Sequence, residues 1–221
     1  MRQKSPAHGN GDGSGRKRAP GRPRSEQARL SILRSTLKLL AKNGFSELTI
    51  EAVAAHANVG KATVYRWWPD KAALIVDAFA SSTTRKLHFP DTGYVRTDMS
   101  QQMRQLVKIF RSRRGRIVSA MLGAGQSDGS LIVAFRERFL KPRRQEAYAT
   151  LRRGIRRGEL RKNVDMDLLL DSLYGPIYMR FLIRHDRLTS DFVEGLCKLT
   201  LGEAKPSPKL SRSRARPTNR R

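Results

Sequence analysis

The chain has 221 residues, 45 lysines and arginines against 19 acids, and a formal net charge of +26. A single cysteine, Cys197, excludes an internal disulfide framework, and we expect it to be a small buried apolar residue. No apolar run approaches the ~18 residues of a membrane span, and Met1 to Asn10 lacks a signal peptide's apolar stretch. We therefore expect a cytoplasmic protein that is not inserted in a membrane, and the charge indicates a polyanionic partner, which could be nucleic acid, an anionic membrane surface or another polyanion.

The excess positive charge is concentrated at the two ends of the chain. Residues 1–24 and 203–221 each hold seven bases and one acid; the first segment is rich in Gly and Pro, and the second in Pro and Ser. Such segments cannot bury enough apolar surface to offset their ordering entropy, so we predict a disordered basic arm (1–24) and a disordered basic tail (203–221). Residues 25–202 show helical periodicity throughout, which predicts an all-α protein.

The first predicted helix runs from about Ser25 to Lys42. Ser25 is placed to cap it, and Glu26 then lies in the first turn, where the helix dipole favours a carboxylate. Asn43-Gly44 ends the helix, because glycine adopts the left-handed conformation without steric cost. Its apolar stripe is formed by Ile32, Leu33, Thr36, Leu37 and Leu40.

Two short helices and a longer one follow. Thr49 caps a helix over residues 50–57, and a third helix runs from about Lys61 to Trp68. Pro69-Asp70 ends the third helix, and Asp70 caps a fourth that extends to about Leu87. The inner face of the second helix is predicted to be Ile50, Val53, Ala54 and Ala57.

The second and third helices have the spacing of a helix-turn-helix, in which the latter helix enters the DNA major groove. Ala54 supplies the small residue where the helices cross, and Asn58 tolerates the positive φ that the turn requires. Val64 is the apolar residue that would lock the third helix onto the second. An ordinary helical hairpin without a DNA role remains the alternative.

Several short motifs of residues 29–76 belong together: the 33–40 stripe, GF at 44–45, LTI at 48–50, VA at 53–54, Val59, KATVY at 61–65, WPDK at 68–71 and Leu74. With these motifs, residues 29–76 resemble the DNA-binding domain of the tetracycline-repressor (TetR) family of bacterial transcriptional regulators. The departures are Asn58, where glycine is usual, and Arg66-Trp67-Trp68, where Tyr, His and Phe are common. The resemblance implies a helix-turn-helix domain over residues 25–88.

The exposed face of the third helix carries the predicted DNA contacts. Thr63 and Tyr65 can reach thymine methyls and base acceptors, and Ala62 permits close approach. The resemblance implies that both Lys61 and Tyr65 contact bases. It also places Trp67 beside a phosphate, and we favour a phosphate over a guanine for Arg66.

Two further residues are predicted to bind the DNA backbone. Thr49 lies at a helix N-terminus, which is a good phosphate site. Lys71 lies in the first turn of the fourth helix, where a cation opposes the dipole; phosphate binding would account for it, and a lysine there is characteristic of the family. Any of these side chains could instead be solvated surface.

The stretch 18–24 precedes the first helix and has a Gly-Arg-Pro core resembling an AT-hook. Arg22 and Arg24 are therefore predicted to enter an A·T-rich minor groove from an extended arm. A tail that adds only nonspecific attraction is the alternative. The C-terminal tail lacks this core and is interpreted as a nonspecific polyanion contact.

The second half predicts further helices, at Met99–Phe110, Ile117–Gly123, Leu131–Arg153 (kinked near Pro142), from Asp165, and at Ser190–Leu201. The last two have broad apolar faces, which favour a four-helix interface with a second copy and hence a homodimer. Those faces comprise Leu169, Leu170, Leu173, Tyr174, Ile177, Tyr178, Phe181 and Leu182, then Phe192, Val193, Leu196, Leu199 and Thr200.

This half resembles the family's ligand-binding and dimerisation domain, predicted here over residues 89–202. The carrying stretches are FRERFL at 135–140 with Pro142, RGEL at 157–160 and LYGPIYMR at 173–180. A small-molecule effector is implied by the family, although for each candidate residue on its own we favour core packing. The candidates are Met103, Phe110, Met121, Phe135, Tyr148, Tyr174 and Tyr178.

We find no catalytic constellation and predict no enzyme, cofactor or metal. His8, His56, His88 and His185 are scattered, with His56 expected to be exposed, and no Gly-rich phosphate loop is present. The sequence predicts a dimeric repressor that binds a palindromic double-stranded operator and is released by a ligand. The alternatives are a nonspecific architectural DNA-binding protein, a sensor that has lost DNA binding, and a protein whose tails contact RNA or membrane.

Overall fold

The computed structural model describes residues 22–202, and over that range every regular element is a helix. Among residues 22–202, none of the helices combines the length and the apolar composition of a membrane span. The elements are α1 (Arg22–Asn43), α2 (Ile50–Ala57), α3 (Lys61–Trp67), α4 (Lys71–Thr83), a 3₁₀ turn (Thr84–Lys86), α5 (Val95–Phe110), α6 (Arg113–Ala124), α7 (Gly129–Phe135), a π-helical turn (Arg136–Leu140), α8 (Lys141–Arg156), α9 (Met166–Ile183) and α10 (Ser190–Leu201).

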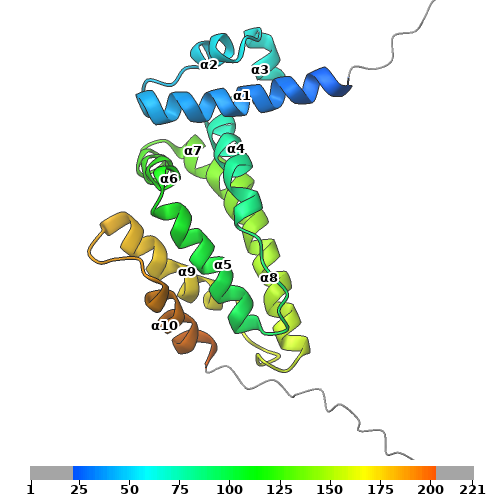
Figure 1. Ribbon diagram of the computed structural model, residues 1–221, viewed down its shortest axis with the longest axis vertical. Coiled ribbons are helices and arrows are strands. Elements are labelled where there is room, and N and C mark those ends of the chain that lie inside the picture. Colours follow the sequence, from blue (N-terminus) through cyan, green and yellow to red (C-terminus); the bar gives the residue numbers. More distant parts are fainter. Residues whose placement is uncertain (1–21, 203–221) are drawn as a thin grey trace, which may run out of the picture.

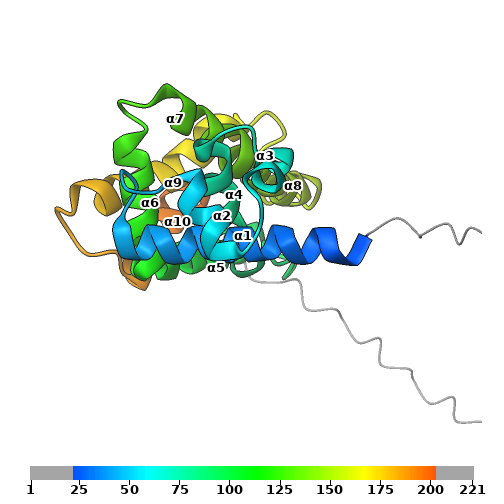
Figure 2. The same cartoon turned by 90° about the horizontal axis from the view of Figure 1, so that it is seen from above.

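The first three helices form a layer at one end of the molecule. α1 lies across that end, and α2 and α3 pack on its outer side (Figure 1). Most of the predicted stripe of α1 is buried, with Ile32, Leu33 and Thr36 almost fully enclosed and Leu37 half-buried. The predicted inner face of α2 is buried throughout. Seen from above, the N-terminal end of α1 projects beyond the rest of the described molecule (Figure 2).

Helix α4 connects this layer to the rest of the protein. Asp70 caps it, accepting a hydrogen bond from the Ala73 amide at 2.7 Å, as its sequence predicts. Residues 72–76 are all buried, because α4 packs against α1 on one side and against α7 and the π-helical turn on another. A change at either end of α4 therefore has a rigid path to the other end.

The remaining helices form the larger C-terminal part. α5 packs against α8, α9 and α10, and its inner face includes Met99, Met103 and Leu106 (Figure 1). α7, the π-helical turn and α8 follow one another without a break, so one long rod runs from Gly129 to Arg156. A π-helical turn lies directly before Pro142, near which the sequence predicts a kink.

The start of α1 differs from the prediction. The helix begins at Arg22, so Ser25 lies inside it rather than capping it, and Glu26 falls beyond the first turn. Pro23 explains the earlier start, because proline is tolerated in a first turn whose amide would have no intrahelical partner. Glu26 instead accepts hydrogen bonds from Arg29.

Other boundaries move by only a few residues. α3 ends at Trp67 with Trp68 as its C-cap, α5 begins at Val95 and α6 at Arg113, each earlier or shorter than predicted. Asp165 caps α9 and α10 spans Ser190–Leu201, both as predicted. The predicted arm up to residue 21 and the tail from residue 203 lie outside the described residues.

Candidate DNA-binding surface and effector cavity

The turn between α2 and α3 has the geometry that a helix-turn-helix requires. Thr49 caps α2 through its hydroxyl, which accepts the Ala52 amide at 3.1 Å. Asn58 adopts the left-handed conformation, with φ 54°, and ends α2. The Val59 amide then donates to the Ala54 carbonyl at 3.0 Å, which fixes the angle at which α3 leaves the turn.

Helix α3 is anchored by two side chains and exposes the others. Val64 and Trp68 are buried, as predicted. Ala62, Tyr65, Arg66 and Trp67 are exposed and Thr63 is half-buried, so α3 presents one continuous face to solvent. This face combines methyl, hydroxyl, guanidinium and indole groups, which suits contact with base edges and phosphates.

Lys61 is the first residue of α3, and its side chain has partners within the protein. Its ammonium forms an ion pair with Glu51 of α2 and lies 5.8 Å from the centre of the Tyr65 ring. The Lys61 ammonium lowers the pKa of the Glu51 carboxyl, and both side chains are exposed. Glu51 was not singled out from the sequence, yet it is the carboxylate nearest this predicted base reader.

Two residues that are predicted to bind the DNA backbone, Trp67 and Lys71, each lie beside a cationic or an aromatic side chain of the protein. The guanidinium of Arg29 lies 5.9 Å from the Trp67 ring. Lys71 is half-buried, and its ammonium lies 4.8 Å above the Phe45 ring. The same ammonium contributes to lowering the pKa of Asp128, after hydrogen bonds from Ser130, so Lys71 lies where α4 meets the start of α7.

The arm residues Arg22 and Arg24 belong to the first turn of α1 rather than to an extended segment. The side chains of Arg22 and Arg24 lie outside the described part of the structure. Their minor-groove role stays a prediction.

A carboxylate that the sequence did not mark connects α3 to the C-terminal part. The indole Nε1–H of Trp68 donates to Asp77 Oδ2 at 2.9 Å, and Arg138 Nη1 donates to the same oxygen at 2.9 Å. The departure at Trp68 was the available signal, because a buried indole needs an acceptor that phenylalanine would not.

The residues proposed for the effector are dispersed. Met103 is fully buried, with the Cys197 Sγ 3.7 Å from its sulfur, and Phe110 is stacked on Phe181 at 3.9 Å. Met121 borders a groove beside the end of α1, and Tyr148 donates its hydroxyl hydrogen to Asp167. Of these four, Phe110 packs edge-on against another candidate, Tyr178, with the ring centres 5.1 Å apart.

Tyr174 and Tyr178 share one cavity of about 60 Å³ between α5, α8 and α9, and a more open hollow of about 390 Å³ beside it. Phe135 borders that hollow only. Tyr174 donates its hydroxyl hydrogen to Gln102 Oε1 at 2.5 Å, whereas Tyr178 makes no hydrogen bond with any described residue. Burial raises the pKa of both phenols, so both stay protonated at neutral pH.

The sequence missed most of the cavity wall. Arg143 and Arg144 line it, but Arg143 is paired with Glu146 and Arg144 with Asp167 and Asp171. The cavity is therefore apolar, with neutral polar groups at its edge. The missed lining residues are Leu87, Phe89, Gln102, Leu106, Phe139, Leu140, Arg143, Arg144, Ala147 and Leu170.

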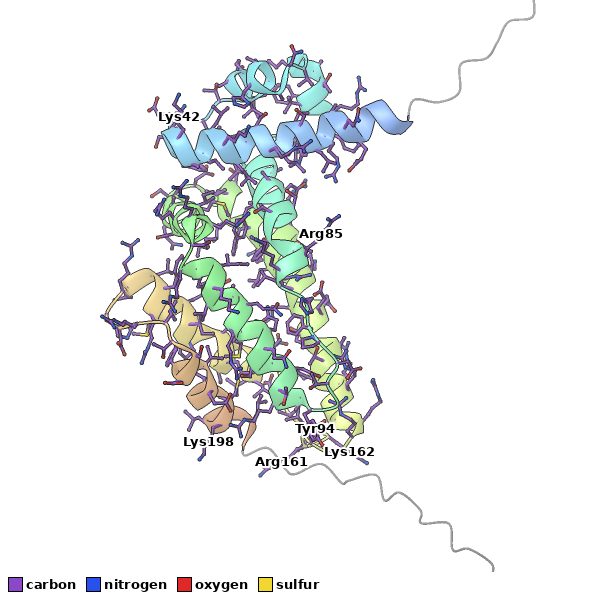
Figure 3. The ribbon with its side chains drawn as sticks, viewed as in Figure 1. Lys42, Arg85, Tyr94, Arg161, Lys162 and Lys198 are labelled. Atoms are coloured by element: carbon purple, nitrogen blue, oxygen red, sulfur yellow. The ribbon has the colours of Figure 1, made fainter. Side chains whose placement is uncertain are left out.

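Basic side chains are not confined to the α3 face. Lys42 lies at the end of α1, while Arg161, Lys162 and Lys198 lie at the end of the molecule farthest from α2 and α3 (Figure 3). His56 is exposed on α2, as predicted, and its Nδ1 is 2.9 Å from the Ser35 hydroxyl. Within residues 22–202 no group of His, Cys, Asp and Glu has an arrangement that could hold a metal ion.

The comparisons with known proteins agree with this geometry. Residues 32–78 match the family described as "Bacterial regulatory proteins, tetR family", and residues 89–200 match "Tetracyclin repressor-like, C-terminal domain".

Individual relatives extend over most of both chains. An uncharacterized HTH-type transcriptional regulator of Bacillus subtilis, YdeS, is 41% identical over 80% of this chain and 89% of its own. A DNA-binding transcriptional repressor TetR of Mycobacteroides abscessus is 30% identical over 67% of this chain and 78% of its own. The crystal structure of the TetR family transcription regulator SCO0332 superposes with a TM-score of 0.71 at 36% identity, covering 81% of this chain and all of that one.

An exposed α3 on a tight turn, the two family matches and these relatives agree. They favour sequence-specific DNA binding over an architectural role. The chain belongs to the tetR family of bacterial transcriptional regulators, and it is a helix-turn-helix DNA-binding protein.

Proposed function

We propose that the protein is a homodimeric repressor whose two α3 helices read a palindromic operator, and that a small apolar ligand releases it. The supporting observation is the α3 face, which turns Tyr65 and its polar neighbours outward while Val64 and Trp68 hold the helix in place. One seven-residue helix reads too few base pairs for genomic specificity, and a two-fold dimer doubles the contacts.

The last two helices provide the proposed dimer face. The outward positions of α9 and α10 carry apolar side chains that a monomer would leave in water, and glycines Gly175 and Gly195 with nothing near them. The faces predicted from sequence prove to be mostly core: Leu173, Ile177, Val193 and Leu196 are buried. The exposed apolar residues are Leu168, Met179, Leu182, Ile183 and Leu199.

On DNA, Lys61, Ala62, Thr63 and Tyr65 are proposed to reach base edges. Arg66, Trp67, Lys71 and the N-terminus of α2 at Thr49 would hold phosphates, and Arg22 and Arg24 would reach the neighbouring minor groove. Lys61 would first exchange Glu51 for the DNA. That exchange costs little, because both side chains are solvated.

The ligand is proposed to enter the cavity at Tyr174 and Tyr178. Its walls are apolar and its arginines are neutralised by acids, so a neutral, largely apolar molecule with one hydrogen-bond acceptor for Tyr178 fits best. A thermal-shift screen should return such compounds, and they should release the operator. Tyr178→Phe should weaken both effects, and hits that are mainly charged would contradict this ligand class.

Selection of bound DNA from a random pool tests the function. We expect an inverted repeat whose half-sites lie about one helical turn apart, bound tightly at moderate salt. Enrichment of no motif, with affinity that collapses as salt rises, would support nonspecific binding and overturn the proposal. Replacing Arg22 and Arg24 with Gln should weaken A·T-flanked sites more than G·C-flanked ones, and equal losses would remove the minor-groove role.

A further inference from the structure

One carboxylate oxygen joins the DNA-reading helix to the C-terminal part of the protein. Asp77 Oδ2 accepts the indole N–H of Trp68 and a guanidinium N–H of Arg138, each at 2.9 Å. Trp68 is the C-cap of α3, Asp77 lies in α4, and Arg138 lies in the π-helical turn between α7 and α8. Three elements therefore meet at a single atom.

The buried side chain of Trp68 links the position of the Asp77 carboxylate to the end of α3. The side chain is 1% exposed, so its position sets the end of α3, and its only polar atom is committed to Asp77. The Asp77 side chain is 28% exposed and that of Arg138 36%, which shields the bridge only in part. A change in the position of the carboxylate must therefore pull on the buried indole.

The other end of the bridge borders the cavity. Phe139 and Leu140 follow Arg138 in the same π-helical turn, and both line the cavity with Tyr174 and Tyr178. Phe139 also packs against Phe79 of α4, with ring centres 5.0 Å apart. A molecule that fills the cavity presses on the turn that holds Arg138, and π-helical turns often lie at functional sites.

We propose that Asp77 is a positioning residue that couples the cavity to DNA affinity, holding α3 through Trp68 and sensing the π-helical turn through Arg138. This inference rests on the proposed operator function and adds the route by which the cavity acts. Filling the cavity should displace Arg138 from Asp77, release the Trp68 indole and loosen the end of α3.

Two single variants test the Trp68–Asp77–Arg138 bridge through their affinity for the operator that selection from a random pool identifies. Trp68→Phe removes the indole N–H, and Asp77→Asn keeps the shape without the charge. Each should weaken operator binding about 5- to 50-fold, and the double variant should be no weaker than the worse single, because both remove one interaction. The slope of affinity against salt should stay unchanged, since no phosphate contact is lost.

Arg136 offers a matched control for Arg138. It lies in the same turn and pairs only with the adjacent Glu137 among the described residues. Arg138→Gln should cost about 3- to 10-fold in operator affinity, whereas Arg136→Gln should stay within about twofold. Equal losses would mean that overall charge, and not the bridge, is responsible.

Because the ligand is unidentified, the experiment uses a variant whose larger side chain fills part of the cavity. Ala147 is buried in the cavity wall, and Ala147→Leu narrows it from α8. The variant should weaken operator binding in the wild-type background and add little in the Asp77→Asn background. If Ala147→Leu lowers operator affinity by the same factor in both backgrounds, the proposed coupling is overturned.

Two readouts separate positioning from folding. The melting temperature of each variant shows whether it folds, and losses of affinity that simply follow melting temperature would overturn the proposal. Hydrogen exchange of the Trp68 indole N–H, one of two indoles in the chain, should quicken in Arg138→Gln without any DNA present. If the wild-type protein selects no DNA, the operator function fails; if it does and Trp68→Phe binds equally well, only this inference fails.

Discussion

The ammonium of Lys61 forms an ion pair with the carboxylate of Glu51 across the turn that joins α2 to α3. The pair places an acid on the face that is proposed to meet DNA, beside a predicted base reader. Because the pair is solvent-exposed, phosphates can replace the carboxylate, but the remaining negative charge opposes them.

Glu51→Gln should therefore tighten DNA binding, by about three- to tenfold at moderate salt, and steepen the salt dependence by about one ion. The measurement is operator affinity across a series of salt concentrations. Glu47→Gln is the control, because it removes a similar charge from the same domain without touching Lys61. Equal gains from both variants would show that only net charge matters.

Lys71→Gln should weaken binding to every sequence and make the salt slope shallower by about one. Glutamine retains much of the aliphatic stem that packs against Phe45, so the fold should persist. Lys86→Gln, in the 3₁₀ turn beyond α4, is the matched control. A change in sequence preference alone, with the salt slope intact, would mean that Lys71 does not bind phosphate.

Ile183→Asp should separate the proposed dimer. Ile183 is 67% exposed on α9, so a carboxylate there costs the monomer little but would be buried between two copies. Sedimentation at micromolar concentration should show half the wild-type mass, and operator binding should fall. Val133→Asp changes another exposed apolar residue, on α7, and should leave the mass unaltered; an unaltered mass for Ile183→Asp as well would place the interface elsewhere.

The carboxylate of Glu194 ties α10 to α5. Burial alone would raise its pKa, but hydrogen bonds from Arg96 and Ser100, aided by Arg104, lower the pKa overall. The ionised form is therefore favoured by folding, and its contribution is present above the unfolded pKa of about 4.3 and is lost as pH falls through the lower folded pKa.

Glu194→Gln should lower the free energy of unfolding at pH 7 by about 1 kcal/mol or less, since its side chain is 44% exposed. The difference from wild type should shrink in urea titrations near pH 3. A difference that is constant from pH 7 to pH 3 would show that packing, and not ionisation, carries the effect.

Gly154 lies where α8 crosses α5. A Cβ at this position would stand 2.8 Å from the Val95 Cβ, so Gly154→Ala should destabilise the protein by about 1–3 kcal/mol. Val95→Ala in the same chain should recover part of that loss by making room. Gly123→Ala, in an open position on α6, should instead stabilise it by up to about 1 kcal/mol; chemical denaturation distinguishes the two.

Local features of the fold could be predicted because each depends on neighbouring residues. Thr49 and Asp70 cap their helices through amides three residues ahead, and Asn58 takes the positive φ of the turn. Val64 and Trp68 are buried because four-residue spacing puts them on one face of α3. Capping, turn chemistry and helical periodicity act within a few residues, so the sequence alone determined the helix-turn-helix.

What the tertiary structure decided involves residues far apart in the chain. Asp77 meets both Trp68 and Arg138, the latter 61 residues away, and no local pattern announces an acceptor on α4. Likewise, periodicity showed that α9 is apolar on several faces, but only packing against α5 and α10 separated the buried Leu173 and Ile177 from the exposed Met179 and Ile183. An apolar residue has the same tendency to leave water on every face, and the neighbouring helices determine which faces are covered.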